Sequence, residues 1–396
     1  MNQPPLEVAD VLRQAGKHFI EKSRRWLTWQ HVRVIRAIQN CRTAALGGHK
    51  DRCSQCGHRA ISFNSCRNRH CPKCQTNARN QWLAARASEV LPVPYFHVVF
   101  TVPQELSTIG LQNKSFFYEL LLRVSAETLL EVAANPKNLG AQIGFLSVLH
   151  TFGQNLLHHP HVHCVLPAGG LSEDHSHWKH TSSPRFFLHV DVLSRVFRGK
   201  FKDALKEAFA QHQINFYGHL SHLADKKQFA RFIRTLYRHK WVVYAKPPFG
   251  GPEHVLNYLA RYTHRVAISN HRLLSFDGQN VAFRWKDYAH GNKKRKMTVS
   301  ADEFLRRFLL HVLPPGFVRI RHYGFLANRR RTAAIALCRK LISEAIPAMA
   351  EPVKPSGCRS NWTCPSCSGS MMVIERLTPS QMLRALSDQR CVLDSS

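Results

Sequence analysis

A pair of histidines separated by one residue, His161 and His163, is the first feature of the sequence that could perform chemistry. The surrounding residues 161–170 alternate in polarity and predict a β-strand. Side chains at positions i and i+2 of a strand point to the same face, so both imidazoles could bind one ion while Val162 points into the core. Such ligands leave Mg²⁺, Mn²⁺ and Zn²⁺ all possible, with open coordination positions for phosphate oxygens. A solvated strand edge or a hydrogen-bonded pair would show the same spacing.

Two histidines hold an ion weakly, so a third ligand is expected. Gln154 lies seven residues before His161, in the strand or turn that leads into a predicted hairpin. The return of the chain could bring its amide oxygen beside the histidine pair. His150, His159 and His264 are alternatives, and spacing alone does not separate them from Gln154.

Tyr258 and Tyr262 lie one helical turn apart in residues 250–265, which predict a helix after a Gly-Pro turn. Residues four apart on a helix share a face, although two core aromatics would have the same spacing. The same helix carries four basic residues that are unusual on a buried apolar stripe: His254, Arg261, His264 and Arg265. Nearby cations and a metal-bound phosphate favour the phenolate, so the two tyrosines could be nucleophiles.

The histidine pair and the tyrosine pair together predict cleavage and rejoining of a phosphodiester. A bound metal ion would polarise the phosphate, a tyrosine oxygen would attack phosphorus, and a 3′-hydroxyl would leave. The resulting 5′-phosphotyrosine stores the phosphodiester bond, so rejoining requires no nucleotide cofactor. With two tyrosines a second strand can be cut while the first stays attached, which is what strand transfer requires.

Two Cys-x2-Cys pairs, Cys53 with Cys56 and Cys71 with Cys74, form a second candidate metal site. Each pair can bring two thiolates to one ion from a tight turn, and the 14 residues between the pairs are typical of a zinc ribbon. We therefore predict that these four cysteines bind one structural Zn²⁺ and that the module folds with the ion. Buried free thiols are the alternative, but this segment is polar and basic. One ligand could be exchanged for a neighbouring donor: Cys66, His58 or His70.

The charge of the chain points to a polyanionic partner. It contains 56 Lys and Arg against 25 Asp and Glu, a formal net charge of +31, and its pI is about 10.2. Such an excess favours nucleic acid, and 44% hydrophobic residues exclude a disordered or fibrous chain. Solvated basic faces are the simplest interpretation of the basic runs. In a DNA-binding protein, phosphate contacts are predicted in the tyrosine helix and in two basic runs: Arg261, Arg265, Lys293, Lys294, Arg295, Lys296, Arg329 and Arg330.

The predicted elements divide the chain into three parts. Residues 1–90 combine helices with the cysteine-rich segment, residues 91–346 mix strands and helices, and residues 347–396 form a tail rich in Pro, Ser and Cys. The clearest elements of the middle part are a helix at 115–135, three strands at 95–103, 144–153 and 161–170, and a hairpin turn at Asp277-Gly278.

The sequence contains no run of about 18 apolar residues and no apolar leader, which predicts a cytoplasmic protein that makes no membrane contact. In that compartment the 12 cysteines favour metal binding over disulfides. In the tail, Cys364 and Cys367, with Cys358 and with Cys338 or Cys391, could form a second zinc knuckle. A disordered tail with incidental cysteines is equally compatible with the sequence.

Four blocks of sequence carry these residues, and together they are specific although each alone is not. They are CSQCGHRAISFNSCRNRHCPKCQ, HTFGQNLLHHPHVHCVLPAGGL, YLARYTHRVAISNHRL and RIRHYGFLANRRR. The chain that contains them, over roughly residues 15–340, resembles the IS91-type transposases, which are two-tyrosine members of the HUH endonucleases. The resemblance implies an α+β fold in which a helical and zinc-ribbon DNA-binding domain precedes a Rep-like HUH catalytic domain, with a central antiparallel sheet flanked by helices.

The resemblance also implies a function, which is transposition by a rolling-circle-like route through single-stranded DNA. Tyr258 and Tyr262 would be the nucleophiles, and His161 and His163 would bind Mg²⁺ or Mn²⁺. Gln154 resembles, by its offset, the upstream polar ligand of Rep-like HUH enzymes. The implied partners are single-stranded transposon ends and target DNA, with a host helicase to displace the strand, at the nucleoid of a bacterial cytoplasm.

Three other functions fit part of the sequence. A replication initiator or relaxase of the HUH type would share the chemistry and differ only in nicking an origin. A zinc-ribbon regulator that binds DNA without catalysis would leave His161, His163 and the two tyrosines unexplained. A hydrolase that uses the histidines and a metal-bound water would cleave phosphodiesters without forming a covalent protein adduct.

Overall fold

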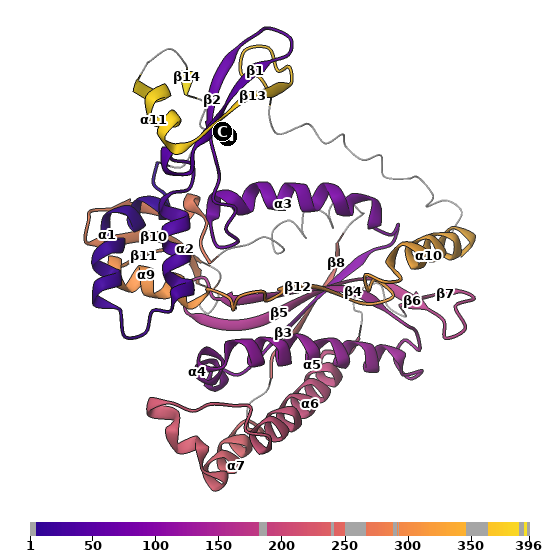
Figure 1. Ribbon diagram of the computed structural model, residues 1–396. Coiled ribbons are helices and arrows are strands. Elements are labelled where there is room, and N and C mark those ends of the chain that lie inside the picture. Colours follow the sequence, from indigo (N-terminus) through magenta and orange to yellow (C-terminus); the bar gives the residue numbers. More distant parts are fainter. Residues whose placement is uncertain are drawn as a thin grey trace. The chain divides into compact units, whose positions relative to one another are not determined.

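The computed structural model describes residues 5–181, 188–238, 241–249, 267–287, 291, 293–345, 363–387 and 392–393 (Figure 1). The chain forms two compact units, and neither is continuous in sequence. The first unit contains Met1–Ala84, His264–Val312 and Lys354–Ser396, and the second contains Ala85–Thr263 and Leu313–Val353. This division differs from the expected ranges 1–90, 91–346 and 347–396, because the tail and the hairpin around Asp277 both pack with the N-terminal residues.

A five-stranded sheet forms the centre of the second unit. Every neighbouring pair of its strands is antiparallel. The strands are, in their order across the sheet, β12 (Ile320–Gly324), β4 (Gly144–Phe152), β5 (His158–Pro167), β3 (Tyr95–Thr101) and β8 (Val243–Phe249). The predicted strands at 95–103 and 144–153 are confirmed, whereas the strand predicted at 161–170 begins three residues earlier as β5. The expectation of a central antiparallel sheet is therefore confirmed.

Helices cover one face of this sheet and form its core with it (Figure 1). Strand residues such as Val98 and Val162 pack there with Phe117 and Phe197 of the helices, all of them fully buried. Burial of each such side chain stabilises the fold by about 2 kcal/mol. The helical elements on this side are α4 (Glu105–Gln112), α5 (Lys114–Ala134), α6 (Val190–Ala210), η3 (Gly218–Ala224) and α7 (Lys226–Thr235).

The remaining elements of the second unit lie around the sheet. A short hairpin follows β5 and begins at Gly169, two residues after β5 ends at Pro167, and a basic helix follows β12. These elements are η2 (Ala87–Glu89), β6 (Gly169–Leu171), β7 (Trp178–His180) and α10 (Arg331–Ala345). In the described part of the chain, no helix combines the length and apolarity needed to cross a bilayer.

The first unit contains a helical pair that packs against a distant hairpin. Asp277-Gly278 forms the predicted turn, where Gly278 adopts a φ of 91° that disfavours other residues. An ion pair of 2.7 Å between Lys22 and Asp302 and a hydrogen bond of 3.2 Å from Val8 N to Asn270 join the two segments. The elements are α1 (Val8–Lys22), α2 (Trp29–Gln39), η4 (Asn270–Arg272), β9 (Leu273–Phe276), β10 (Asn280–Asp287), β11 (Lys293–Ser300) and α9 (Ala301–Leu310).

The C-terminal tail completes a second sheet of the first unit. Tail strand β13 pairs antiparallel with β1, and β14 pairs parallel with β2, so two tail strands enclose an N-terminal hairpin. Ile61 of the hairpin packs with Leu377 and Met382 of the tail. The elements are η1 (Ala44–Leu46), β1 (Gly48–Cys53), β2 (Arg59–Phe63), α3 (Pro72–Arg86), β13 (Met371–Leu377), α11 (Pro379–Ser387) and β14 (Val392–Leu393).

Candidate functional site

Three histidines converge on the face of the five-stranded sheet opposite the helical core. His161 and His163 lie in β5, the middle strand, and His150 in β4 is paired in register with His161. Opposite residues in an antiparallel pair share a face, as do residues two apart in one strand. The ligand nitrogens of the three side chains all lie within 4.8 Å of one another. This arrangement can hold one metal ion between two adjacent strands.

Hydrogen bonds determine which ring nitrogens are left for a metal ion. His161 Nδ1 lies 2.6 Å from the carbonyl oxygen of His159. Because a carbonyl oxygen only accepts, Nδ1 carries the proton, and the lone pair that could bind metal is on Nε2. His163 Nδ1 lies 2.8 Å from Nε2 of His97 in β3. A proton donated by His163 Nδ1 to His97 likewise leaves His163 Nε2 for the ion.

His97 also fixes the plane of the His163 ring. The two rings are nearly parallel, with their centroids 5.0 Å apart and an interplanar angle of 11°, and His97 is only 2% exposed. This residue was not predicted from the sequence. Its one signal was a polar side chain in the middle of the apolar strand 95–103, which fits a hydrogen-bonded core histidine equally well.

Burial on this face of the sheet favours neutral imidazoles. His150 and His163 are 2% and 7% exposed. Burial lowers the pKa of His159, and burial likewise lowers the pKa of His322, which lies on the same face in β12, to about 4. Since a metal ion binds the neutral form of histidine, burial at this face opposes the protonation that would compete with the metal.

The other predicted residues of this site are only partly located. Gln154 lies half-buried in the turn between β4 and β5, and its role as a ligand stays a prediction. The third histidine of the group is His150, which the sequence offered only as an alternative to Gln154. The residues of the predicted tyrosine helix lie outside the described residues: Tyr258, Arg261, Tyr262, His264 and Arg265.

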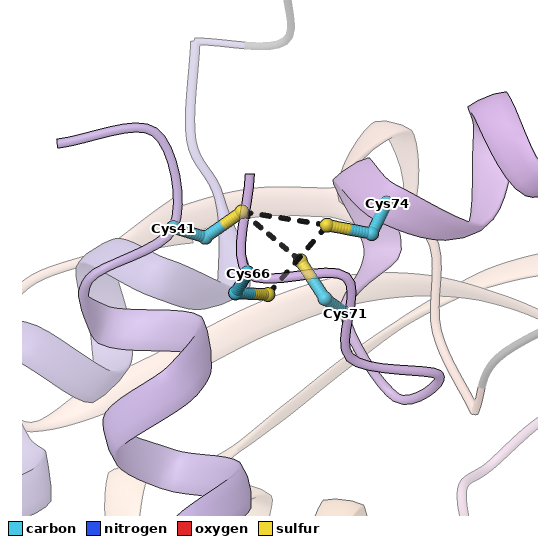
Figure 2. A group of neighbouring side chains, drawn as sticks. All are labelled: Cys41, Cys66, Cys71 and Cys74. Atoms are coloured by element: carbon cyan, nitrogen blue, oxygen red, sulfur yellow. Dashed lines mark hydrogen bonds between the residues drawn. The ribbon is translucent and has the colours of Figure 1, made fainter. Parts of the chain in front are cut away.

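Four cysteines of the first unit form a compact group (Figure 2). Cys41 follows α2, Cys66 follows β2, and Cys71 and Cys74 lie at the start of α3. Their sulfurs are separated by 3.6 Å between Cys41 and Cys74, 3.6 Å between Cys41 and Cys71, and 3.5 Å between Cys66 and Cys74. In a tetrahedral ZnS₄ centre with bonds of about 2.3 Å, sulfurs lie roughly 3.8 Å apart. The group therefore fits a structural Zn²⁺.

The neighbouring sulfurs change one another's ionisation. Hydrogen bonds from Cys66 and Cys71 lower the pKa of Cys41 to about 7. Hydrogen bonds with Cys41 and Cys66 instead raise the pKa of Cys71. Thiolates at this spacing repel one another, and a divalent cation that binds all four removes the repulsion.

The structure does not bring the two predicted Cys-x2-Cys pairs together. Cys53 and Cys56 lie at the turn of the β1–β2 hairpin and group with Cys364 and Cys367 of the tail. Cys71 and Cys74 instead group with Cys66, which follows the open end of the hairpin, where Gly48 pairs with Phe63. At about 3.3 Å per residue the five steps of β1 separate the turn from the open end by roughly 16 Å. One ion cannot bridge that distance, so a single site of four cysteines is not compatible with this fold.

The predicted DNA-contacting residues that the structure describes are exposed. Lys293 to Lys296 lie in β11, an edge strand, and Arg329 and Arg330 lie in the turn before α10. Arg295 makes an ion pair of 3.1 Å with Asp287. The register of β10 and β11 puts four cations on the face opposite Phe283: Arg284, Lys286, Lys294 and Lys296. This face is suited to phosphate groups.

Comparison with known proteins gives two family matches and two curated relatives. Residues 144–333 match a family model described as "Putative transposase", and residues 11–102 match one described as "Transposase zinc-binding domain". The chain is 52% identical over 379 residues to "Putative transposase y4qJ" of Sinorhizobium fredii strain NGR234, covering 93% of this chain and 95% of that protein. It is 29% identical over 328 residues to the transposase for insertion sequence element IS801 of Pseudomonas savastanoi pv. phaseolicola, covering 82% and 77%. No solved structure matches the chain significantly.

Proposed function

Because the chain belongs to the IS91 family of transposases, we propose that it nicks and rejoins single-stranded DNA through 5′-phosphotyrosine intermediates. The observation that carries this proposal is the group of His150, His161 and His163 on the middle of the sheet. A cluster of imidazoles on rigid strands suits a catalytic metal site, since the strands fix the directions of the ligands. It lies in the range matched by the first family model.

Mg²⁺ or Mn²⁺ held by the three histidines, with Gln154 as a further predicted ligand, would supply a Lewis acid that polarises the scissile phosphate. The chain itself orients the ligands. His161 Nδ1 donates to the carbonyl oxygen of His159, and His163 is held against His97. The first contact sets the tautomer of His161, and both contacts hold their rings in one orientation while DNA binds and leaves.

The nucleophiles of the proposed reaction are Tyr258 and Tyr262. The phenolic oxygen of one tyrosine would form a bond to phosphorus, and the bond from phosphorus to the 3′-oxygen would break. The departing 3′-hydroxyl later attacks the phosphotyrosine in the reverse sense, which restores the phosphodiester and frees the tyrosine. With the second tyrosine available, donor and target strands can be cut and exchanged in one complex.

Single-stranded transposon ends and the target strand are the proposed substrates, and the exposed cations of β11 are proposed to contact their phosphates. The net charge of +31 supports this role, because neutralising phosphates releases counterions and favours binding. A host helicase that displaces the strand would complete the rolling-circle-like route.

The experiment is a denaturing-gel assay for a covalent protein–DNA adduct. Purified full-length protein is incubated with Mg²⁺ or Mn²⁺ and single-stranded oligonucleotides that tile the DNA flanking its own gene. The proposal expects a metal-dependent adduct that is lost in the Tyr258→Phe, Tyr262→Phe double variant. Tyr217→Phe is the matched control, because Tyr217 lies immediately before η3 and is 62% exposed; this variant should form the adduct normally.

Each other outcome of that assay would indicate a different activity or a different nucleophile. Cleavage without an adduct would indicate a hydrolase that uses a metal-bound water. Binding without cleavage, on tiles that include both ends, would indicate a regulator. An adduct that persists in the double variant would show that another residue is the nucleophile.

A further inference from the structure

The turn of the β1–β2 hairpin has a specific backbone conformation around its two cysteines. The amide of Cys53 donates to the carbonyl oxygen of His58 over 2.8 Å, and the amide of Gly57 donates to the carbonyl of Cys53 over 3.2 Å. Gly57, directly after the second cysteine, adopts a φ of 74°. The amide of Gln55 donates to the Cys53 sulfur over 3.4 Å. Amide-to-sulfur bonds of this kind stabilise a thiolate.

The tail repeats this conformation more than 300 residues later in the sequence. The amide of Cys364 donates to the carbonyl of Gly369 over 2.8 Å, and the amide of Ser368 donates to the carbonyl of Cys364 over 2.9 Å. Ser368, directly after the second cysteine, adopts a φ of 59° although it is not glycine. The amide of Ser366 donates to the Cys364 sulfur. The two loops therefore present their cysteine pairs in the same way.

The two loops face each other through their sulfurs. Cys53 Sγ lies 3.5 Å from Cys367 Sγ, and Cys56 Sγ lies 3.6 Å from Cys364 Sγ, and all four sulfurs lie within 4.8 Å of one another. All four are free thiols, and the separations are far longer than a disulfide bond of about 2.05 Å. They agree with the roughly 3.8 Å expected around a tetrahedral zinc ion.

From this geometry we infer that Cys53, Cys56, Cys364 and Cys367 bind a second structural Zn²⁺, which fastens the C-terminal tail to the N-terminal hairpin. This zinc is distinct from the one that fits Cys41, Cys66, Cys71 and Cys74. Two of its four ligands lie outside residues 11–102, the range that matches the zinc-binding family model. The site therefore goes beyond that domain and beyond the nicking chemistry proposed above.

Around the four cysteines, the two loops contact each other through hydrogen bonds and through one close approach of the backbone. Little apolar surface is buried there. Ser54 donates from its amide and its hydroxyl to the carbonyl of Ser370, over 3.0 and 3.1 Å. A Cβ added at Gly369 would lie 3.1 Å from the Cys53 sulfur and 2.6 Å from Gln55 Oε1, so a side chain there would press on the sulfur and displace the end of Gln55. The local hydrophobic cluster consists of Cys53, Ala60, Cys364 and Met371, and two of these are ligands. Such a small core requires the ion for stability.

The test measures the zinc content of the purified full-length protein by mass spectrometry of the metal. Relative to the wild type, the Cys364→Ser, Cys367→Ser double variant should lose one zinc per chain. The matched control is Cys358→Ser, Cys391→Ser, which makes the same change at two other tail cysteines and should lose none. Retention of all zinc by the first variant would overturn the proposal, as would loss of zinc from the control.

A second set of variants separates a shared site from loss of folding. Cys53→Ser, Cys56→Ser should also lose one zinc, and the variant with all four substitutions should lose no more than one. Loss of two zinc ions from the fourfold variant would mean that each pair serves a different site or that the unit unfolds. In cobalt-substituted protein, each double variant should lose half of the thiolate-to-cobalt absorption, whereas an unchanged spectrum would contradict the shared tetrathiolate site.

Discussion

His97 is the residue whose effect on the proposed metal site follows most directly from the structure. Its Nε2 lies 2.8 Å from His163 Nδ1, so a proton donated by that nitrogen would put the lone pair for the ion on His163 Nε2, and the two rings are nearly parallel. It is a positioning residue, since it is not a member of the three-histidine group. Partners of this kind typically change metal affinity by about 10- to 100-fold when they are lost.

We expect His97→Ala to shift the Mn²⁺ concentration that half-saturates adduct formation upward by about 10- to 100-fold. The rate at saturating metal should change less, because the tyrosines remain. His97→Gln, whose carbonyl oxygen can still accept from His163 Nδ1, should recover part of the affinity. The exposed His219, on η3, gives a control variant, His219→Ala, that should titrate as the wild type does. An unchanged Mn²⁺ midpoint in His97→Ala would refute the positioning role.

The contact between the N-terminal hairpin and the tail can be tested at Gly47. This glycine adopts a φ of 68°, and a Cβ there would lie 2.4 Å from the carbonyl oxygen of Leu377 in the tail. Gly218 has a similar φ of 57° but open space around it. A side chain at either glycine would therefore strain the backbone to a similar extent. Only a side chain at Gly47 would also collide with β13.

We expect Gly218→Ala to destabilise the protein by about 1 kcal/mol, the cost of a left-handed conformation. Gly47→Ala should cost roughly 2 kcal/mol more, because the main chain of the tail must move. Hydrogen exchange measured on both variants should show faster exchange in residues 371–377 for Gly47→Ala only. Equal exchange in the two variants would indicate that the tail does not pack at Gly47.

The sequence predicted local elements well and distant pairings poorly. The Asp277-Gly278 turn and the β4–β5 pair follow from neighbouring residues, because hairpins are specified by turn chemistry and alternation. The cysteine groups do not follow in this way. Both Cys-x2-Cys pairs near the N-terminus have zinc-ribbon spacing, yet each finds its partners elsewhere, at Cys41 and Cys66 or in the tail. Spacing identifies a chelating pair but leaves open which other pair completes the site.

Over the whole molecule, the positive charge determines how the affinity for DNA depends on salt. Lys294 and Lys296 are exposed on one face of the edge strand β11, together with Arg284 and Lys286 of β10. If both lysines contact phosphates, they contribute to counterion release when single-stranded DNA binds. The slope of log K against log salt then reports the number of these contacts, since each phosphate contact contributes about 0.7 to the magnitude of the slope for a single strand.

We expect Lys294→Gln, Lys296→Gln to reduce the magnitude of that slope by about 1.4 and to weaken binding of all sequences alike. Zinc content and thermal stability should not change, because both side chains are exposed. Lys340→Gln on α10, also exposed, is the control and should leave the slope as it is. Fluorescence anisotropy with a single-stranded oligonucleotide at several salt concentrations measures both the affinity and the slope. An unchanged slope in the double variant would remove this face from the DNA interface.

The pairing of β1 with β13 has a consequence for the way the protein is made. Residue 48 leaves the ribosome long before residue 377, its partner in the sheet. At a synthesis rate of roughly 5 to 20 residues per second, residue 377 is added about 16 to 66 seconds after residue 48. A nascent chain, or one cut short by a premature stop, lacks that strand and the second pair of cysteines. The first unit is therefore complete only after residues 371–377 have been made, more than 300 residues after the hairpin that they cover.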